Sequence, residues 1–171
     1  RGSNNFEDLD LSRATILGGN SLETRQVNSL GDLNGLSPNL HLSGNGIKSF
    51  GDVISMRGIG NTPFFSSPGV QLYVDGVPQG NVFSYGSDLY DLEAVEVLKG
   101  PQGSRFGKLA PGGAINLITK KPEDMQTSEL SASYASFNTQ KYYISSSGPM
   151  DEQFSYSLGV QRSSSDGFLN N

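Results

Sequence analysis

The sequence predicts an α+β domain of short strands, short helices and long loops, followed by a set of antiparallel strands. Three observations support this division. Glycine is abundant, with 22 of 171 residues, which is typical of β-structure joined by tight turns. The composition changes after Lys120-Lys121-Pro122. Beyond that point apolar and polar residues alternate with a period of two, which predicts strands with one apolar face.

Short elements are expected in the first 43 residues. Residues 14–17 have the composition of a strand. Residues 20–23 have the spacing of a capping box and predict a short helix that ends near Val27. Leucines spaced by three within residues 30–36 predict a second helical segment, with Ser29 as its N-cap.

Glycine-rich loops separate the strands expected between residues 44 and 122. The predicted strands are residues 53–57, 70–74, 94–98 and 114–119, and the loops are residues 44–51, 59–69, 78–87 and 100–113. Asp75-Gly76 predicts a chain reversal, because glycine tolerates a positive φ. One or two helical turns are expected at residues 88–93. The last strand is apolar apart from Asn116 and is therefore expected to be buried.

Three segments near the C-terminus show the period-two alternation. They are residues 129–135, 140–147 and 153–161, joined by short turns. Such strands place one face in an apolar medium and the other in water. Alternation alone favours a soluble antiparallel sheet with one buried face. Segments of about ten residues linked by short turns are also typical of a transmembrane β-barrel.

The composition argues against several classes of function. The sequence has no cysteine, and its only histidine is His41, so thiol catalysis and multi-histidine metal sites are excluded. We expect His41 to be a structural or exposed residue. The net charge of -5 argues against nucleic acid as a partner. No Gly-x-Ser-x-Gly nucleophile motif occurs. We therefore expect neither an enzyme nor a cofactor or metal site.

Four motifs in order carry a family resemblance. Residues 56–60 read MRGIG, and residues 73–78 read YVDGVP. Residues 92–107 read LEAVEVLKGPQGSRFG, and residues 112–122 read GGAINLITKKP. Their order and spacing resemble the plug domain of TonB-dependent outer-membrane receptors, and the resemblance covers most of residues 14–122.

The resemblance implies a domain organisation. Residues 14–122 would form the plug domain, after an N-terminal extension at residues 1–13 whose first residues resemble a tag remnant. Residues 123–127 would be a linker, and residues 128–171 the first strands of an outer-membrane β-barrel, incomplete in this sequence. The implied fold is an α+β plug with a small mixed sheet, followed by antiparallel strands of a truncated transmembrane barrel. The resemblance thus reverses the preference for a soluble sheet.

The resemblance also implies a function. A plug inside the barrel lumen, facing the periplasm, would gate nutrient import through the outer membrane of a Gram-negative bacterium. Its partners would be its own barrel, TonB of the TonB–ExbB–ExbD complex and a small nutrient such as a ferric siderophore. Iron chelates, cobalamin, haem and oligosaccharides all suit this design. Residues 1–13 contain no segment that matches a TonB box. The alternative is a stand-alone plug-like module for ligand binding or signalling, without transport.

In this family, basic plug residues meet barrel glutamates and hold the plug in place. Motif position implies this latch role for Arg57 and Lys99, with Glu93 and Glu96 adding charge nearby. Breaking a desolvated charge pair is costly, so such pairs can hold a register. Lys99 replaces the usual arginine and cannot make the bidentate contact of a guanidinium. The alternative for Arg57 is a solvent-facing charge at a strand end.

The resemblance places ligand-contacting apices in three loops. Aromatic and amide side chains there would supply contact area and hydrogen bonds. The candidates are Asn45, Lys48, Phe50, Asn61, Phe64, Phe65, Gln79, Asn81, Phe83 and Tyr85. The alternative is that the aromatic residues pack these loops onto the domain. The glycines expected at turns or close approaches of the backbone are Gly58, Gly76, Gly100, Gly107, Gly112 and Gly113.

Overall fold

The chain divides into two compact units, Arg1–Lys120 and Lys121–Asn171, in a computed structural model. The structure describes residues 14–27, 29–43, 53–60, 68–80, 89, 91–101, 111–122, 124–151 and 153–166. Within this part of the chain, the first unit contains the helices and strands β1 to β8, and the second contains β9 to β11.

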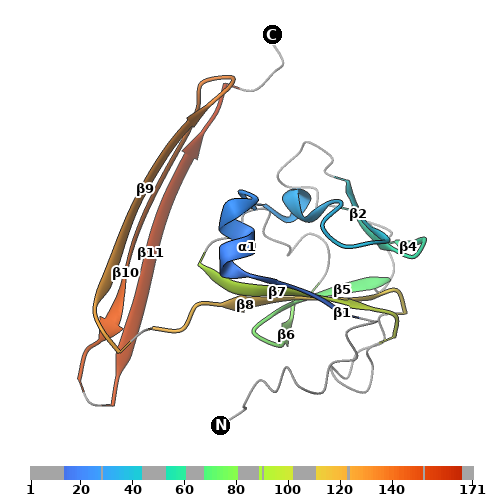
Figure 1. The fold of residues 1–171 in the computed structure, drawn as a ribbon, viewed down its shortest axis with the longest axis horizontal. Helices are drawn as coiled ribbons and strands as arrows, with labels where there is room; N and C mark the ends of the chain where they lie inside the picture. Colours follow the sequence, from blue (N-terminus) through green and yellow to red (C-terminus); the bar gives the residue numbers. More distant parts are fainter. Residues whose placement is uncertain are drawn as a thin grey trace. The chain divides into compact units, whose positions relative to one another are not determined.

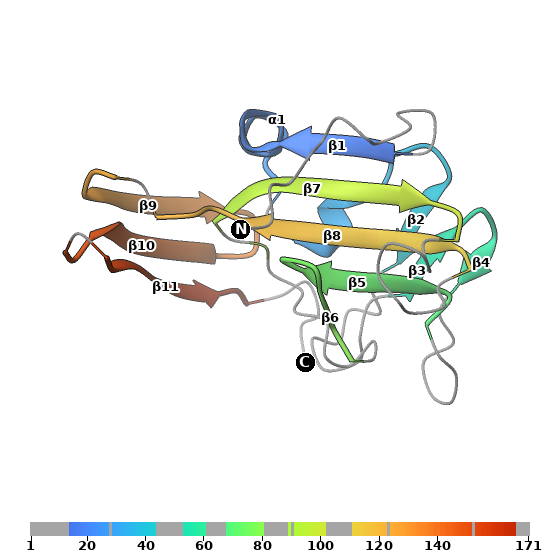
Figure 2. The same ribbon diagram turned by 90° about the horizontal axis from the view of Figure 1, so that it is seen from below.

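A five-stranded sheet forms the centre of the first unit. Its strands are β1 (Ala14–Gly18), β5 (Val70–Val74), β6 (Val77–Pro78), β7 (Leu92–Lys99) and β8 (Gly113–Thr119). They lie in the order β1-β7-β8-β5-β6, as Figure 2 shows. Neighbouring strands are antiparallel except β5 and β8, which run parallel. The two longest strands, β7 and β8, therefore pair with each other inside the sheet.

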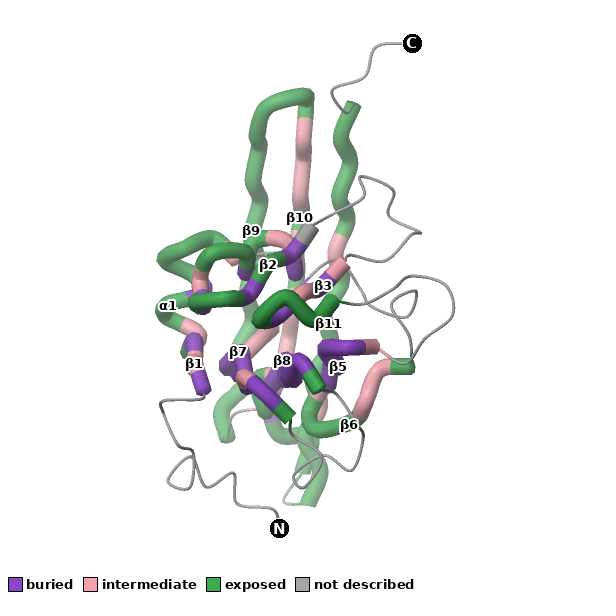
Figure 3. Tube along the Cα trace, turned by 90° about the vertical axis from the view of Figure 1, so that its right-hand side faces the viewer, coloured by how far each residue is buried: buried purple, intermediate pink, exposed green. Residues whose placement is uncertain are grey.

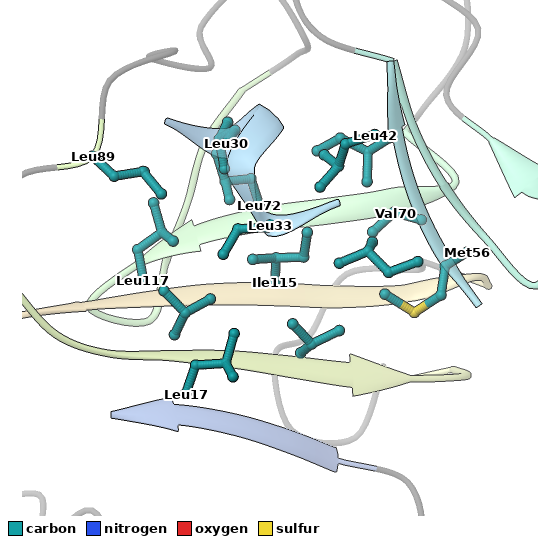
Figure 4. Close-up of a cluster of buried hydrophobic side chains, with 14 of the residues drawn as sticks. Leu17, Leu30, Leu33, Leu42, Met56, Val70, Leu72, Leu89, Ile115 and Leu117 are labelled. Atoms are coloured by element: carbon teal, nitrogen blue, oxygen red, sulfur yellow. The ribbon is translucent and has the colours of Figure 1, made fainter. Parts of the chain in front are cut away.

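Short helices and a small second sheet cover one face of this sheet (Figure 1). They are α1 (Gly19–Thr24), the 3-10 helix η2 (Leu30–Leu33), and the antiparallel strands β2 (Leu40–Ser43), β3 (Val53–Met56) and β4 (Ile59–Gly60). Leu33 of η2, Leu42 of β2 and Met56 of β3 belong to one buried apolar cluster, which also includes Val70 and Ile115 of the larger sheet (Figure 4). This cluster is the hydrophobic core of the first unit.

The opposite face of the five-stranded sheet is also buried and carries polar groups. The strand register places Glu96 of β7 beside Asn116 of β8, and Asn116 beside Tyr73 of β5. Tyr73 is 1% exposed, Glu96 2% and Asn116 7%. Strands buried on both faces need no polar alternation, which explains the nearly continuous apolar run of β8. The prediction of a buried strand at residues 114–119 is confirmed.

The second unit is a three-stranded antiparallel sheet. Its strands are β9 (Thr127–Ala135), β10 (Thr139–Pro149) and β11 (Ser155–Ser164), in the order β11-β10-β9. The register aligns Leu130, Ile144 and Val160 in one row across the sheet. These side chains are 75%, 58% and 62% exposed, and Figure 3 shows most of this unit as exposed. The three predicted strands are confirmed, each longer than predicted, and their apolar face is exposed.

The first helix differs from the prediction at both ends. Its N-cap is Gly18 in an extended conformation, so Asn20 lies inside the first turn and the predicted capping box is wrong. The Asn20 carbonyl instead accepts a hydrogen bond from the Thr24 hydroxyl at 2.7 Å. The helix ends at Thr24 rather than near Val27, because Gln26 has a positive φ of 52° and leaves the helical conformation.

The second helical segment agrees with the prediction at its start. Ser29 is its N-cap, and the Ser29 backbone N–H donates a hydrogen bond to the Asp32 carboxylate at 2.9 Å. The segment is a single 3-10 turn that ends at Leu33. None of the helices in the described ranges is long and apolar enough to cross a membrane.

The helical turns predicted at residues 88–93 are wrong where the structure describes them. Leu92 and Glu93 are the first residues of strand β7, and Leu92 pairs with Thr119 of β8. Pairing along a neighbouring strand outweighs a local helix signal of a few tenths of a kcal/mol per residue. Asp88 and Tyr90 lie outside the described residues.

Two tight turns have the same backbone conformation. Asp75-Gly76 has φ values of 50° and 78° and joins β5 to β6, which confirms the predicted reversal. Arg57-Gly58 has φ values of 52° and 78° and joins β3 to β4. Strand β3 therefore ends at Met56, one residue before the predicted end. The two short strands that follow these turns extend into segments predicted as loops.

Candidate functional site

Arg57 lies in the turn of the β3–β4 hairpin and is exposed. Its backbone N–H donates a hydrogen bond to the Asn39 carbonyl at 3.1 Å, which holds the hairpin to the segment before β2. Its guanidinium approaches the turn after β7, since a Cβ placed on Gly100 would lie 3.6 Å from Arg57 Nη1. Gly100 follows Lys99 directly. The structure therefore brings Arg57 close to the end of β7 that carries Lys99.

Close backbone contacts hold this end of the sheet together. Gly100 N–H donates to the Gly112 carbonyl at 3.0 Å, and Gly112 N–H donates to the Gly69 carbonyl at 2.8 Å. Gly113 has a φ of 144°, and a Cβ there would clash with the Leu98 carbonyl oxygen and the Met56 sulfur. The β3–β4 hairpin can approach β8 this closely only because Gly113 has no side chain.

The two glutamates predicted beside the latch cations lie elsewhere on β7. Glu93 is exposed near the start of the strand, where the register with β8 shifts. At about 3.3 Å per residue it is about 20 Å from Lys99. Glu96 is buried and accepts a hydrogen bond from Asn116 Nδ2 at 2.9 Å. Among the described residues, no carboxylate forms an ion pair with Arg57 or Lys99.

Most of the predicted ligand-contacting residues lie outside the described residues. These are Asn45, Lys48, Phe50, Asn61, Phe64, Phe65, Asn81, Phe83 and Tyr85, together with the predicted turn glycine Gly107. Gln79 is described and is partly buried. Its backbone N–H donates to the Leu72 carbonyl at 2.9 Å, and its carbonyl accepts a hydrogen bond from the buried Gln71 amide. The base of the third predicted ligand loop is therefore fixed to β5.

A polar cluster that sequence reasoning missed lies along the second half of β8. We call Asp75, Asn116 and Thr119 the Asp75 cluster. The Asp75 carboxylate accepts hydrogen bonds from Thr119 N–H at 2.9 Å and from the Thr119 hydroxyl at 2.7 Å. Asn116 Oδ1 accepts a hydrogen bond from Gly76 N–H at 3.1 Å. In β8 the available signal was Asn116, the only amide in a strand whose remaining residues are apolar apart from Thr119.

The described residues offer binding groups but no metal cluster. Within the described ranges, no group of three or more His, Cys, Asp or Glu side chains could hold a metal ion. His41 lies on β2 and is exposed, as expected from the sequence. Burial raises the pKa of the Tyr73 phenol above its usual range. The exposed Arg57 and the half-buried Lys99 near Gly100 are suited to binding carboxylates.

Several proteins of known type resemble this chain. It is 32% identical over 159 residues to the pesticin receptor of Yersinia enterocolitica, an alignment that covers 92% of this chain and 23% of the relative. It is 37% identical over 92 residues to the catecholate siderophore receptor Fiu of Escherichia coli, covering 54% of this chain and 11% of the relative. The chain thus spans less than a quarter of the length of these curated relatives.

A solved structure shows the same likeness in three dimensions. The ferric yersiniabactin uptake receptor FyuA of Yersinia pestis superposes with a TM-score of 0.78 at 30% sequence identity, covering 87% of this chain and 23% of that one. The family model described as the TonB-dependent receptor plug domain matches residues 9–114, which include the Arg57 hairpin and strands β1 to β7. The chain belongs to the family of TonB-dependent receptor plug domains.

Proposed function

We propose that this chain is the plug and the first barrel strands of a TonB-dependent transporter in the outer membrane of a Gram-negative bacterium. The transporter imports a scarce nutrient, and a ferric siderophore is the favoured cargo. The relatives support this choice, because their names describe receptors for a catecholate siderophore and for ferric yersiniabactin. The plug acts as the gate and contributes ligand contacts, while TonB provides the coupling to energy.

One observation carries the outer-membrane part of the proposal. The plug-type unit is followed in the same chain by a sheet whose apolar row of Leu130, Ile144 and Val160 is exposed. The alternating side chains of the opposite face are mostly serine, threonine and other polar residues. An apolar outer face and a polar inner face are what a barrel wall requires between lipid and an aqueous lumen.

Arg57 and Lys99 form the latch in this proposal. Arg57 is exposed in the hairpin turn, and its guanidinium reaches Gly100 beside Lys99. Two cations at the same end of the plug suit a barrel carboxylate, which would be partly desolvated inside the lumen. Glu93 and Glu96 have a smaller part in the latch, because the structure separates them from Lys99 along β7.

Uptake by whole cells tests the transport function. The full receptor is produced in a Gram-negative host without its own siderophore receptors, and uptake of radioactive iron is measured with a ferric catecholate and with ferric yersiniabactin. We expect uptake of at least one chelate and its loss in a host without TonB. Binding without TonB-dependent uptake would instead favour the stand-alone ligand-binding module.

The latch is tested in the same cells. Arg57→Ala is expected to loosen the seating of the plug and to raise sensitivity to large antibiotics that the intact outer membrane excludes. Arg25→Ala is the matched control, because Arg25 is also exposed but lies after α1, away from Gly100. Equal antibiotic sensitivity of the two variants would contradict the latch role of Arg57.

A further inference from the structure

Three hydrogen bonds of Asp75 bind the end of β8 to the β5–β6 turn. The Asp75 carboxylate accepts both the backbone N–H and the hydroxyl of Thr119, at 2.9 and 2.7 Å. In the reverse direction, Asp75 N–H donates to the Leu117 carbonyl at 2.8 Å. A charged acceptor with two donors makes stronger hydrogen bonds than a neutral pair. The turn therefore holds the last residues of β8 through side chain and backbone together.

The contacts continue across the sheet to β7. Asn116 Oδ1 accepts the Gly76 N–H at 3.1 Å, and Asn116 Nδ2 donates to Glu96 Oε2 at 2.9 Å. Glu96 and Asn116 are 2% and 7% exposed, so water cannot readily replace either partner if the contact opens. One amide side chain thus connects the β5–β6 turn to the middle of β7.

The chain is also held at the residue that follows β8. Lys120 N–H donates to the Asp91 carbonyl at 2.7 Å, and Lys120 Nζ lies 3.6 Å from Glu23 Oε1 of α1. Lys120 is the last residue of the first unit. Polar contacts therefore hold the chain up to the point where it leaves this unit.

We propose that the Asp75 cluster is a clamp that keeps the exit of the plug rigid while the gate moves. The clamp holds β8 from its middle residue, Asn116, to its last residue, Thr119, whereas Arg57 and Lys99 lie at the Gly113 end. With seven residues in β8, the two ends are about 20 Å apart. Asp75 and Asn116 act as positioning residues that hold this part of β8 in place during gating. This last step rests on the proposed transport function.

The backbone at Asp75 allows a sharp test of the clamp. Its φ of 50° is in the left-handed region, where alanine would add strain but glycine and asparagine are both tolerated. Asp75→Gly removes the carboxylate and relieves the backbone. Asp75→Asn keeps an acceptor for Thr119 N–H, and its amide can donate to the Thr119 hydroxyl. Comparing the two variants therefore distinguishes the loss of the side-chain hydrogen bonds from an effect on the backbone conformation of the turn.

Hydrogen–deuterium exchange in the full receptor measures the clamp directly. We expect Asp75→Gly to speed exchange of the Thr119 and Lys120 amides by about tenfold or more, because hydrogen bonds to a charged group are lost. Asp75→Asn should stay within about threefold of the original rate. Val77→Ala, an exposed change in the same hairpin, is the control and should have no effect. Unchanged exchange in Asp75→Gly, or equal increases in the glycine and asparagine variants, would overturn the proposal.

A second measurement tests whether the clamp matters for gating. In cells with the full receptor, Asp75→Gly should lower the rate of iron uptake severalfold and leave chelate binding unchanged, and Asp75→Asn should restore uptake. Normal uptake in a glycine variant with rapid Thr119 exchange would overturn the gating role of the clamp. Absence of uptake in the unaltered receptor would instead contradict the transport function. That result would not bear on the clamp itself, because exchange at Thr119 is measured without any cargo.

Discussion

Both units contain antiparallel strand pairs, but the central sheet of the first unit is buried and the sheet of the second unit is exposed. Strand β8 has six consecutive buried residues, whereas all nine residues of β9 are exposed. The five-stranded sheet packs a core against α1, η2 and the small sheet. The three-stranded sheet exposes a row of aliphatic side chains instead. Both sheets have hydrogen-bonded strands, so hydrogen bonding does not explain the difference. The medium in which a sheet is stable depends on the side chains on its two faces.

This difference has an energetic consequence. Burying a valine, leucine or isoleucine contributes about 1.5–3 kcal/mol. The first unit obtains this contribution from its own residues. The second unit obtains little of it in water, because Leu130, Ile144 and Val160 are more than half exposed. An apolar environment such as lipid would supply the missing contribution. Two comparisons between matched positions test this contrast, and one exposed ion pair of the first unit tests how much charge adds to apolar burial.

Adding a methyl group should be severe in the first unit and mild in the second. Gly113→Ala places a Cβ against the Leu98 carbonyl and the Met56 sulfur at a φ of 144°. We expect a loss of more than about 4 kcal/mol in the free energy of unfolding of the first unit. At Gly159 of β11 a new Cβ would lie 3.4 Å from the Tyr143 hydroxyl, an ordinary contact. Gly159→Ala should therefore change the stability of the second unit by less than about 1 kcal/mol.

Urea unfolding followed by circular dichroism measures the free energy of unfolding of Gly113→Ala. Hydrogen exchange of the amides in each unit shows which unit is destabilised. A mild effect at Gly113 would show that the β3–β4 hairpin can move away from β8 at low cost. That result would contradict the close packing described for this end of the sheet.

Truncating an isoleucine should again destabilise the first unit much more than the second. Ile115→Ala removes a fully buried side chain and should cost about 2–5 kcal/mol of unfolding free energy. Ile144→Ala removes a side chain that is 58% exposed and should cost less than about 1 kcal/mol in water. Denaturant midpoints measured by circular dichroism provide the comparison. Similar losses for both variants would mean that the second unit has a buried core of its own.

Removing a surface ion pair should have the smallest effect. Lys120 Nζ lies 3.6 Å from Glu23 Oε1, and the two side chains are 44% and 70% exposed. We expect Lys120→Ala to lower the unfolding free energy by less than about 1 kcal/mol, because exposed pairs are screened by water and salt. The thermal midpoint at low and high salt measures this effect. A larger loss that shrinks at high salt would show that this ion pair contributes more to the stability of the first unit than expected for an exposed pair.

Local patterns predicted much of the fold. The Asp75-Gly76 turn followed from glycine tolerance of positive φ, and the strands of the second unit followed from alternation. The helix expected at residues 88–93 failed because Leu92 gains a pairing partner, Thr119, that lies far away in the sequence. The capping box at residues 20–23 failed because Gly18, the last residue of β1, is already the N-cap and the helix begins at Gly19.

The candidate site was predicted less completely. Family motifs identified Arg57 and Lys99 separately, and the structure added that the Arg57 guanidinium reaches Gly100. The sequence also suggested that Glu96 acts beside these cations. The register instead places Glu96 opposite Asn116, inside the sheet. A carboxylate in a sequence does not reveal its neighbours, because they come from other strands.

Sequence patterns alone were enough for the Asp75-Gly76 turn, the two kinds of hydrophobic pattern and the family resemblance, because φ preferences and side-chain periodicity are local properties. Strand order is not local, and the fold was needed to place β7 beside β8 and β5 parallel to β8. That order places Asp75 next to Thr119 and Asn116 next to Glu96. The physical reason is that cross-strand neighbours depend on strand order and register, which are set by long-range packing of the core.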